Sequence, residues 1–479
     1  MATIIEQLAE FTSTQAQFEQ LPQEVVLETK RILLDSIGCG LAALGERGAE
    51  IGVRHGKRLG AGQAEATIFG SSEKVSIMGA AFANAELINA LDFDAVVPPG
   101  HVAPYVIPGA LAVAEQQGSS GKDLIAAIAV AHEIPHRIGK AMGYLRDIKD
   151  GKPATPDIIG FSVTLFGAAA AIAQVQKLDT ATIGNVLGIA GSISPVNSQR
   201  AWVAHAPSTT IKYLLPGMLA QTALTAASMG ELGHRGDTRI LDDADYGYPK
   251  FIGTPRWEPA VITAGLGEKW RFTKELIYKP YPHCRVMHGL METLIEIVET
   301  ENLRPEEIDS IEAWGEAWVM EPIWENRIIK DVRDAQFSMA HGLSVAAHRV
   351  TPGRDWQDPA VVFDPSVLGL MERTTVEAHP DWAAAVSAHP SARPSRIRVS
   401  ARGTTFTGER SFPKGSPSPD PDTYFTDAEL IEKFRHNADG VLASAAAESA
   451  IEAIMNLESV SDINAVTQLL GAVQPARVG

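Results

Sequence analysis

Cysteine is scarce in this sequence, and long apolar runs are absent. The 479 residues include 2 cysteines, Cys39 and Cys284, which lie far apart and form no CxxC pair. A disulfide framework and a cysteine-rich metal site are therefore excluded. Every apolar stretch is interrupted by a charge or a turn residue before it could cross a bilayer, so we expect no membrane-spanning segment.

Basic residues are outnumbered by acidic ones. Lysine and arginine number 41 against 58 aspartates and glutamates, which gives a formal net charge of -17. Such a charge repels nucleic acid and anionic membranes, so neither is expected as a partner. Residues 1–10 lack the basic start and apolar core of a secretion signal and instead suggest an acidic amphipathic helix. We therefore expect a cytoplasmic protein.

The length and the apolar spacing predict a helical first half in a chain of two domains. Hydrophobic residues make up 45% and charged residues 21%, as is usual for a folded protein, and the chain is too long for one simple core. Apolar residues recur with helical spacing in 23–44, 75–91 and 122–142. Segments rich in alanine and glycine, which predict closely packed helices, occupy 167–174, 182–190 and 214–229.

The pattern changes near residue 270. Residues 308–318 alternate like a strand, and 395–412 predict a hairpin with a turn near Gly403. A stretch rich in proline and serine at 415–422 suggests a linker. Further helices are expected at 286–300, 335–347, 427–437 and 439–455.

These patterns predict a mainly α protein. A large helical domain would begin in residues 1–268 and be completed by C-terminal helices in 413–479. A smaller α+β lid domain, 269–412, would be inserted between them. A cleft between the two domains is the natural place for a site.

The first candidate site is a pair of carboxylates followed by a histidine. Asp92 and Asp94 end a predicted helix, and a loop containing proline and glycine leads back to His101. An aspartate beside a histidine can hold the imidazole in one tautomer for acid or base catalysis. From spacing alone, a helix end with solvated acids is the simpler interpretation.

The second candidate is a basic loop in an otherwise acidic protein. Lys279, His283, Arg285 and His288 are gathered in a short segment in which two prolines precede a helix that begins near residue 286. A helix N-terminus surrounded by cations is a ready anion site. The alternative is a basic surface loop.

The third candidate segment contains Arg200 and His205, with Lys212 after it. These residues supply cations in a region of low charge, but ordinary loop and helix-end residues are the favoured interpretation. Lys212 is expected to extend its ammonium group to solvent.

A motif for zinc peptidases also occurs, as His132-Glu133-Ile134-Pro135-His136. In HExxH, two histidines one helical turn apart bind the metal. Pro135 would disrupt that helix, and no third ligand follows, so we predict no metal site. The sequence also lacks a P-loop, a GxGxxG after a strand and a GxSxG elbow.

Taken together, the segments resemble the MmgE/PrpD family, which includes 2-methylcitrate dehydratase, cis-aconitate decarboxylase and iminodisuccinate epimerase. The resemblance covers nearly the whole chain. It rests on the order and spacing of Leu34-Asp35-Ser36-Ile37-Gly38, Ala90-Leu91-Asp92-Phe93-Asp94 before His101, Arg137-Ile138-Gly139-Lys140, Lys279-Pro280-Tyr281-Pro282 with His288, and Asp334-Ala335-Gln336-Phe337-Ser338.

The resemblance implies a large helical domain, an α+β lid, a homodimer, and a cleft that needs no metal or organic cofactor. The family's site residues fall on Asp92, His101 and Lys279. His288 belongs to the same motif as Lys279, and His341 falls near a position where a relative carries a tyrosine.

Several positions depart from the family pattern. Ala95 replaces a second aspartate, and Val102-Ala103 replaces Pro-Ser after the histidine. A histidine of the decarboxylase branch aligns with Asp157, and a site lysine of that branch aligns with Ala206. These departures argue against decarboxylation of cis-aconitate and imply a substrate with fewer carboxylates than citrate.

The resulting hypothesis is a cofactor-independent lyase that removes a proton next to the carboxylate of a small substrate. Lys279, Arg285 and Arg200 would fix the carboxylates. His101, oriented by Asp92, would transfer the proton, and the opposite acid or base would be one of three histidines, His205, His283 or His288.

Dehydration of a hydroxy-carboxylate is the favoured reaction, because dehydratases are common in the family. An epimerase of a substituted dicarboxylate is the main competing hypothesis, and a decarboxylase is less favoured. A catalytically silent protein that binds carboxylates and a zinc hydrolase are two further hypotheses.

Overall fold

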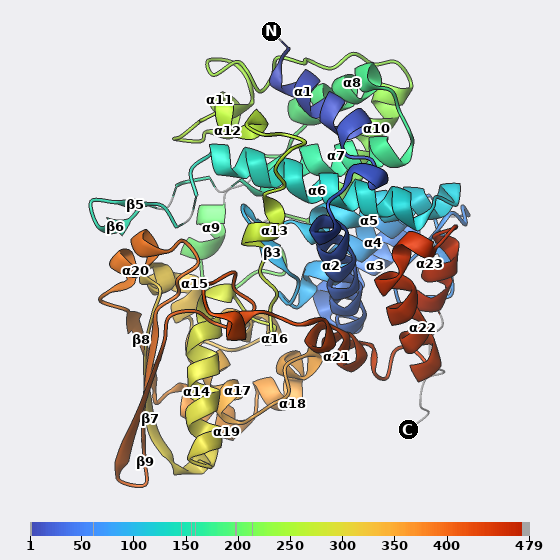
Figure 1. Ribbon diagram of the computed structural model, residues 1–479. Helices are drawn as coiled ribbons and strands as arrows, with labels where there is room; N and C mark the ends of the chain where they lie inside the picture. Colours follow the sequence, from blue (N-terminus) through green and yellow to red (C-terminus); the bar gives the residue numbers. More distant parts are fainter. Residues whose placement is uncertain are drawn as a thin grey trace.

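The computed structural model describes residues 2–471, apart from residues 61, 145, 155, 159, 197, 198 and 213 and the side chains of Gln199 and Trp318. Helices dominate this part of the chain, and one four-stranded sheet lies at the lower left in Figure 1. The expected mainly α fold with a smaller α+β portion is confirmed.

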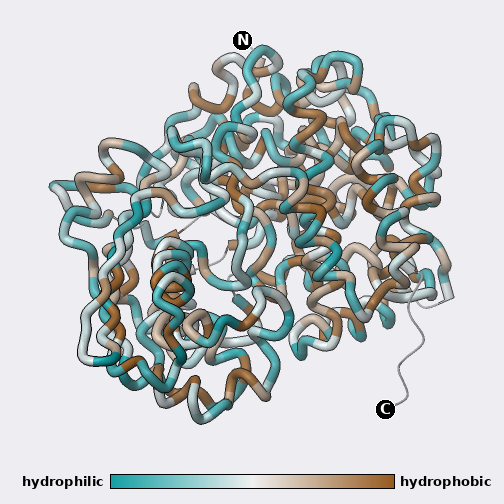
Figure 2. Tube along the Cα trace, turned by 60° about the horizontal axis from the view of Figure 1, so that its bottom comes forward, coloured by the Kyte–Doolittle hydropathy of each residue, from teal (hydrophilic) through white to brown (hydrophobic). Residues whose placement is uncertain are grey.

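Seven helices form the core of the helical region. Their bounds are α2 (Gln23–Ala42), α4 (Ile77–Ala90), α5 (Ala103–Gln117), α6 (Gly121–Ala141), α7 (Thr164–Val175), α8 (Thr180–Ser192) and α10 (Pro216–Glu231). Small residues let these helices approach closely. A Cβ atom on Gly167 of α7 would lie 2.4 Å from the carbonyl oxygen of Ala131 in α6, so this packing requires glycine. In Figure 2, brown, hydrophobic stretches run through the middle of the molecule, and teal, hydrophilic stretches are common along its outline.

The sheet has the strand order β10-β9-β7-β8. Its strands are β7 (Ile308–Gly315), β8 (Thr374–Ala378), β9 (Ser395–Ala401) and β10 (Thr404–Arg410). Strands β9 and β10 form the predicted antiparallel hairpin, whereas β8 pairs with β7 in parallel. Alternate side chains of β9 are buried, because α14 (His288–Thr300) packs on β9 and β10.

Shorter helices complete the lid and its connections. They include α1 (Ile4–Glu10), α3 (Arg47–Arg58), α9 (Gln199–Ala204), α11 (Tyr248–Ile252), α12 (Ala260–Thr263), α13 (Phe272–Glu275), α15 (Pro322–Glu325), α16 (Val332–Ala335), α17 (Met339–Ala347), α18 (Pro359–Val362), α19 (Pro365–Met371) and α20 (Trp382–Ala388). Among the described helices, none combines the length and the apolar character that a bilayer crossing demands.

The C-terminal helices return to the helical region. Helices α21 (Asp427–Ala438) and α22 (Ser444–Met455) pack on α2, and α23 (Asn464–Leu470) packs on α22. In Figure 1, red C-terminal helices accordingly lie beside blue N-terminal ones. The predicted domain boundaries near residues 268 and 412 stay predictions.

The segment 415–422 connects β10 to α21, as a linker would. It also contacts the site, because Ser416 is buried and its hydroxyl accepts a hydrogen bond from the Arg285 guanidinium. The polar composition of the segment therefore reflects contacts with the site.

Candidate active site

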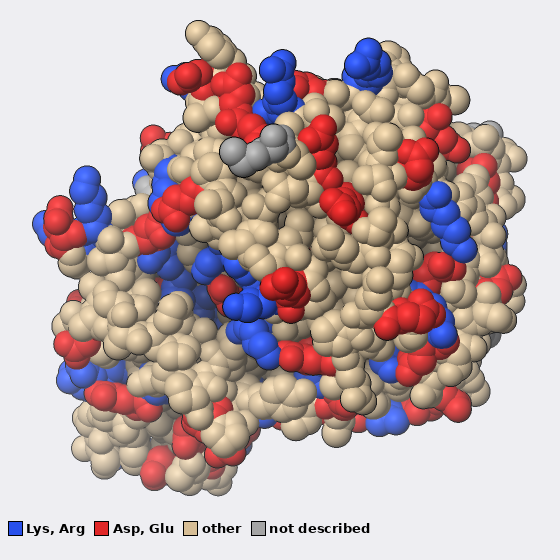
Figure 3. All heavy atoms as spheres, turned by 45° about the horizontal axis from the view of Figure 1, so that its top comes forward, with Lys and Arg blue, Asp and Glu red and all other residues tan. Residues whose placement is uncertain are grey.

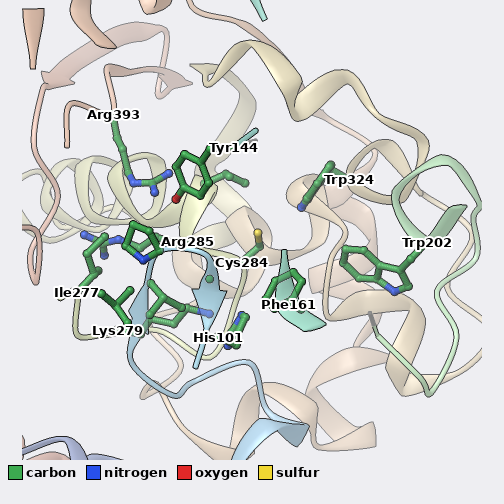
Figure 4. A pocket seen from close by; sticks show the side chains of 15 residues that line it. His101, Tyr144, Phe161, Trp202, Ile277, Lys279, Cys284, Arg285, Trp324 and Arg393 are labelled. Carbon is green, nitrogen blue, oxygen red and sulfur yellow. The ribbon is translucent and has the colours of Figure 1, made fainter. Parts of the chain in front are cut away.

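An internal cavity lies where the helical region meets the lid. The helical region contributes Val97, His101 and Phe161, and the lid contributes Lys279, Arg285 and others. The cavity has a volume of about 80 Å³ and adjoins an outer groove of about 1230 Å³, with which it shares Tyr144 and Arg393. The side chains drawn in Figure 4 include Tyr144, Trp202, Cys284, Trp324 and Arg393.

The turn after α4 positions the acidic residues. Helix α4 ends at Ala90, and Asp92 then adopts a left-handed backbone with φ of 54°, a conformation that aspartate tolerates better than most residues. Strands β3 (Val96–Val97) and β4 (Gly100–His101) form a tight antiparallel pair that returns His101 to this turn. Gly100 is required here, because a Cβ atom at φ of 154° would lie 2.6 Å from the Phe161 ring.

The imidazole of His101 lies between two buried carboxylates. Its Nδ1 is 2.8 Å from Oδ2 of Asp94, and its Nε2 is 3.2 Å from Oδ1 of Asp92. Asp92 and Asp94 have no exposed surface. A carboxylate at Nδ1 favours the tautomer that carries its proton there. Nε2 is then the atom that can transfer a proton to a ligand, and it must exchange its contact with Asp92 to do so. Asp94 therefore takes the orienting position that the sequence had suggested for Asp92.

Asp92 is held by two lysines. Nζ of Lys279 is 2.6 Å from Oδ2 of Asp92, and Nζ of Lys212 is 3.0 Å from Oδ1. Burial alone would raise the pKa of Asp92, but the charges of Lys212, Lys279 and His101 hold that pKa well below its usual value. Lys212 does not reach solvent as expected, because it is buried against this carboxylate.

A second buried pair supports the same turn from the other side. Nζ of Lys433 in α21 is 2.7 Å from Oδ1 of Asp35 in α2, and it also donates to the carbonyl oxygens of Phe93 and Lys279 at 2.8 and 2.9 Å. Asp35 in turn accepts the N–H of Ala95 at 3.0 Å. Lys433 thus connects α2, the aspartate turn and the lysine loop of the lid.

Two arginines at one end of the cavity share one carboxylate, and a third arginine lies close by. Nε of Arg146 is 3.2 Å from Oε2 of Glu316, and Arg393 binds Oε1 of the same side chain. Burial, followed by the charges of Arg146 and Arg285, lowers the pKa of Arg393, so the three guanidinium groups are close neighbours. We call Arg146, Arg285, Arg393 and Glu316 the arginine cluster.

Arg285 is held by neutral groups. Its guanidinium donates to the carbonyl oxygen of Pro413 at 3.3 Å, to the hydroxyl of Ser416, and to Nδ1 of His288 at 3.1 Å. Burial lowers the pKa of Arg285 to about 9. Nε of Arg285 and Nε of Arg393 are buried and have no hydrogen-bond partner among the described residues.

The three histidines predicted in the lid lie behind the cavity wall, outside its lining. Nε2 of His288 is 3.0 Å from the carbonyl oxygen of His283, and Nδ1 of His283 accepts the N–H of Cys284 at 2.9 Å. Nε2 of His341 is 3.0 Å from the carbonyl oxygen of Val362. Burial lowers the pKa of all three, that of His283 to about 3, which favours neutral rings that fix the loop.

Three other predicted residues also lie outside the cavity lining. His205 and Asp157 are exposed, and Arg200 forms an ion pair with Glu321 at 2.5 Å. A role of these three residues in catalysis or substrate binding would require their segments to move toward the cavity. Their assignment to the site stays a prediction.

The HExxH residues are occupied by contacts within the helical region. Glu133 pairs with Arg137 at 2.6 Å and accepts backbone N–H groups of Arg271 and Phe272. Nδ1 of His132 lies 2.8 Å from the carbonyl oxygen of Ile128. Within the described residues, no group of three or more histidine, cysteine, aspartate and glutamate side chains is arranged to hold a metal ion.

Several residues near the site carry no sequence signal that marks them. They are Tyr144, Phe161, Trp202, Trp324 and Arg393 in the cavity and Arg146 in the adjoining groove. They come from loops and short helices far apart in the chain, and no spacing rule connects them. Asp94 was predicted together with Asp92 as part of the first candidate site, but the orienting role was assigned to Asp92.

Comparison with known proteins supports the family resemblance. The chain is 23% identical to cis-aconitate decarboxylase of Homo sapiens, over 96% of this chain and 92% of the human protein. It is 24% identical to cis-aconitate decarboxylase of Mus musculus, over 94% and 90% of the two chains. It is 23% identical to cis-aconitate decarboxylase-like protein oryM of Aspergillus oryzae, over 95% of each.

All three names denote decarboxylases, which are lyases, the class of enzyme that the family resemblance implies. Two family models cover nearly all of the chain. The MmgE/PrpD N-terminal domain matches residues 6–260, and the MmgE/PrpD C-terminal domain matches residues 281–459. The chain therefore belongs to the MmgE/PrpD family.

Proposed function

We propose that this protein is a cofactor-independent lyase that dehydrates a small hydroxy-carboxylate by proton transfer at the carbon next to a carboxylate. The observation that carries the proposal is the position of His101, whose Nδ1 is 2.8 Å from Asp94 and whose ring lines a cavity that ends in the arginine cluster. A proton-transfer group and an anion-binding group therefore face the same small space.

The arginine cluster supplies the electrostatic part of the reaction. Removing a proton next to a carboxylate builds negative charge on the carboxylate oxygens, and buried guanidinium groups stabilise that charge more strongly than water does. Arg285 and Arg393 both line the cavity, so their guanidinium groups are the cations nearest to a carboxylate bound there. Binding also fixes the orientation of the reacting carbon.

The proposed steps balance as an elimination of water. Nε2 of His101 takes the proton from the α-carbon, and the electrons of that C–H bond form the carbon–carbon double bond. The C–O bond at the neighbouring carbon breaks, and the departing hydroxyl accepts a proton to leave as water. One histidine can perform both transfers on the same face of the substrate, and Asp94 stabilises the imidazolium between them.

Two buried lysines keep Asp92 ionised beside Nε2 of His101. A permanent negative charge at 3.2 Å from Nε2 stabilises the protonated ring after it has taken the substrate proton. Asp92 and Asp94 thus assist the same histidine from opposite sides.

Decarboxylation is a second candidate, because the three similar proteins are named for it. In that reaction the carbon–carbon bond to one carboxylate would break, carbon dioxide would leave, and His101 would protonate the remaining carbanion. The same arginines would stabilise the intermediate. Only the direction of the His101 proton transfer and the bond that breaks would differ.

Product analysis tests the proposal. The protein is incubated with a panel of hydroxy-di- and tricarboxylates and their unsaturated counterparts in D₂O. Proton NMR follows the unsaturated, hydrated and decarboxylated acids that form. Formation of an unsaturated acid from a hydroxy acid supports the dehydratase. Carbon dioxide release without water loss supports decarboxylation instead, and the His101→Gln variant controls for contaminating enzymes.

A further inference from the structure

The cavity is chemically divided into two ends. In Figure 4, Arg393, Tyr144 and Arg285 lie toward one side and Trp202 and Trp324 toward the other, with His101 and Lys279 between them. This arrangement restricts the substrate, because each end of the cavity must be complementary in charge and polarity to the substrate group that it contacts.

The arginine end carries the excess positive charge. The arginine cluster has three guanidinium groups and the single carboxylate of Glu316, which leaves two positive charges without a carboxylate among the cluster's members. Around His101, by contrast, Lys279 and Lys212 are matched by Asp92 and Asp94. Positive charge is therefore concentrated at one end, where two guanidinium groups, those of Arg285 and Arg393, line the cavity and Arg146 lines the adjoining groove.

The opposite end is apolar and enclosed. Trp202 and Trp324 meet edge to face with ring centroids 6.2 Å apart, and Phe161 joins them in the lining. These three side chains are 8%, 2% and 2% exposed. None of the described residues that line this end carries a positive charge. A carboxylate placed here would lose its hydration without gaining a cation, which is strongly unfavourable.

The mouth of the cavity is at the arginine end. An outer groove of about 1230 Å³ shares Pro98, Tyr144, Ile277 and Arg393 with the cavity, and Arg146 and Lys140 also line it. Basic and acidic side chains both gather around a hollow on the face shown in Figure 3. A ligand entering from the groove would thus place an apolar group in the enclosed end and leave its carboxylates near the arginines.

We propose that the substrate is a dicarboxylate with an apolar substituent, held by its two carboxylates at the arginine cluster and by the substituent against Trp202 and Trp324. This inference rests on the proposed function and narrows its substrate. Combined with dehydration, the substrate is a malate that carries an alkyl or aryl group. Its C–H and C–O bonds break, and the products are the unsaturated dicarboxylate and water.

The test compares two unreactive ligands that differ in one arm. Isobutylsuccinate and tricarballylate are both substituted succinates of similar size, the first with an apolar arm and the second with a third carboxylate. Calorimetric titration of the purified protein gives their Kd values, with succinate as the reference. We expect isobutylsuccinate to bind about tenfold more tightly than succinate, and tricarballylate to bind no more tightly than succinate.

Two variants test which end of the cavity binds the apolar arm and which end binds the carboxylates. Trp324→Ala should bring isobutylsuccinate close to the affinity of succinate while leaving succinate unchanged, and Arg285→Gln should weaken both ligands. Thermal melts confirm that each variant is folded. Tighter binding of tricarballylate than of isobutylsuccinate to the unmodified protein, or no binding of any of the three, would overturn the inference.

The outcome is separable from that of the proposed function. None of the three ligands carries a hydroxyl group, so their binding does not depend on turnover. Dehydration of a tricarboxylate would leave the proposed reaction in place and overturn this substrate assignment. Tighter binding of isobutylsuccinate than of tricarballylate, with no reaction of any hydroxy acid, would support the substrate assignment and overturn the proposed dehydration.

Discussion

Nδ1 of His101 lies 2.8 Å from a carboxylate oxygen of Asp94, and the two residues are joined through the tight strand pair that pairs Val96 with His101. The aspartate is fully buried, and the histidine is 6% exposed. This contact gives the imidazole a fixed direction toward the cavity. Several measurable consequences depend on it.

Replacing Asp94 by asparagine should impair turnover far more than binding. The amide keeps the size of the side chain but can present an N–H to Nδ1, which favours the wrong tautomer of His101. A loss in kcat of about a hundredfold to ten-thousandfold is expected, with KM changed by less than tenfold. Steady-state kinetics of Asp94→Asn measure this.

The matched control is Asp35→Asn. Asp35 is also buried and binds Lys433, but it does not touch His101. This variant should lose stability and retain more activity per folded molecule than Asp94→Asn. Equal kcat values for the two variants would contradict the special position of Asp94.

Breaking the Lys212–Asp92 pair should destabilise the fold. Lys212→Met leaves Asp92 with one lysine fewer at a fully buried position, and loss of one partner of a buried ion pair costs about 3–5 kcal/mol in free energy of unfolding. Urea denaturation, monitored by circular dichroism, measures the difference in free energy of unfolding between the variant and the unmodified protein.

A double variant tests whether that loss arises from the stranded charge. Asp92→Asn combined with Lys212→Met should lose less stability than the two single losses added together, by roughly 1–3 kcal/mol. Strict additivity would show that the two side chains are not energetically coupled.

Glu86 should make the protein less stable as the pH rises toward neutrality. Burial raises its pKa from 4.5 to about 7, so the folded state binds the proton more tightly than the unfolded chain does. The free energy of unfolding therefore falls as the pH rises from about 4.5 to about 7, by up to about 3 kcal/mol from this group.

Glu86→Gln should remove that dependence. A glutamine oxygen can still accept the N–H of Gly217, which lies 2.9 Å from the Glu86 carboxylate. The variant should be more stable than the unmodified protein at pH 8 and nearly equal to it at pH 5. Urea titrations at the two values measure this, with the exposed Glu10→Gln as control. An equal gain at both pH values would refute the assignment.

Ser416 should affect substrate binding from outside the cavity lining. Its hydroxyl and the carbonyl oxygen of Pro413 hold one end of the Arg285 guanidinium. Ser416→Ala should raise KM by about threefold to tenfold and leave kcat nearly unchanged, because the arginine keeps its charge but loses part of its orientation. A fall in kcat with constant KM would assign Ser416 a different role.

Much of the fold follows from local patterns. The apolar spacing of 23–44 predicted α2 (Gln23–Ala42) closely, and the alternation of 395–412 predicted the β9–β10 hairpin. The parallel pairing of β7 with β8 was not predicted, because it joins segments separated by several helices and depends on tertiary packing.

The site was predictable where its residues are close in sequence. Asp92, Asp94 and His101 are brought together by one turn and one tight strand pair, which spacing can suggest. The arginine cluster joins Arg146, Arg285, Glu316 and Arg393 from four separate segments. No periodicity connects such positions, and their proximity depends on how the lid packs on the helical region.

Proton exchange at the α-carbon tests the central claim most directly. Once a substrate or unreactive hydroxy-dicarboxylate analogue binds, deuterium from D₂O should enter its α-position, as measured by proton NMR. The account predicts exchange with the unmodified protein and at least a hundredfold slower exchange with folded His101→Gln. Exchange at an unchanged rate in that variant would contradict the assignment of His101 as the proton-transfer residue.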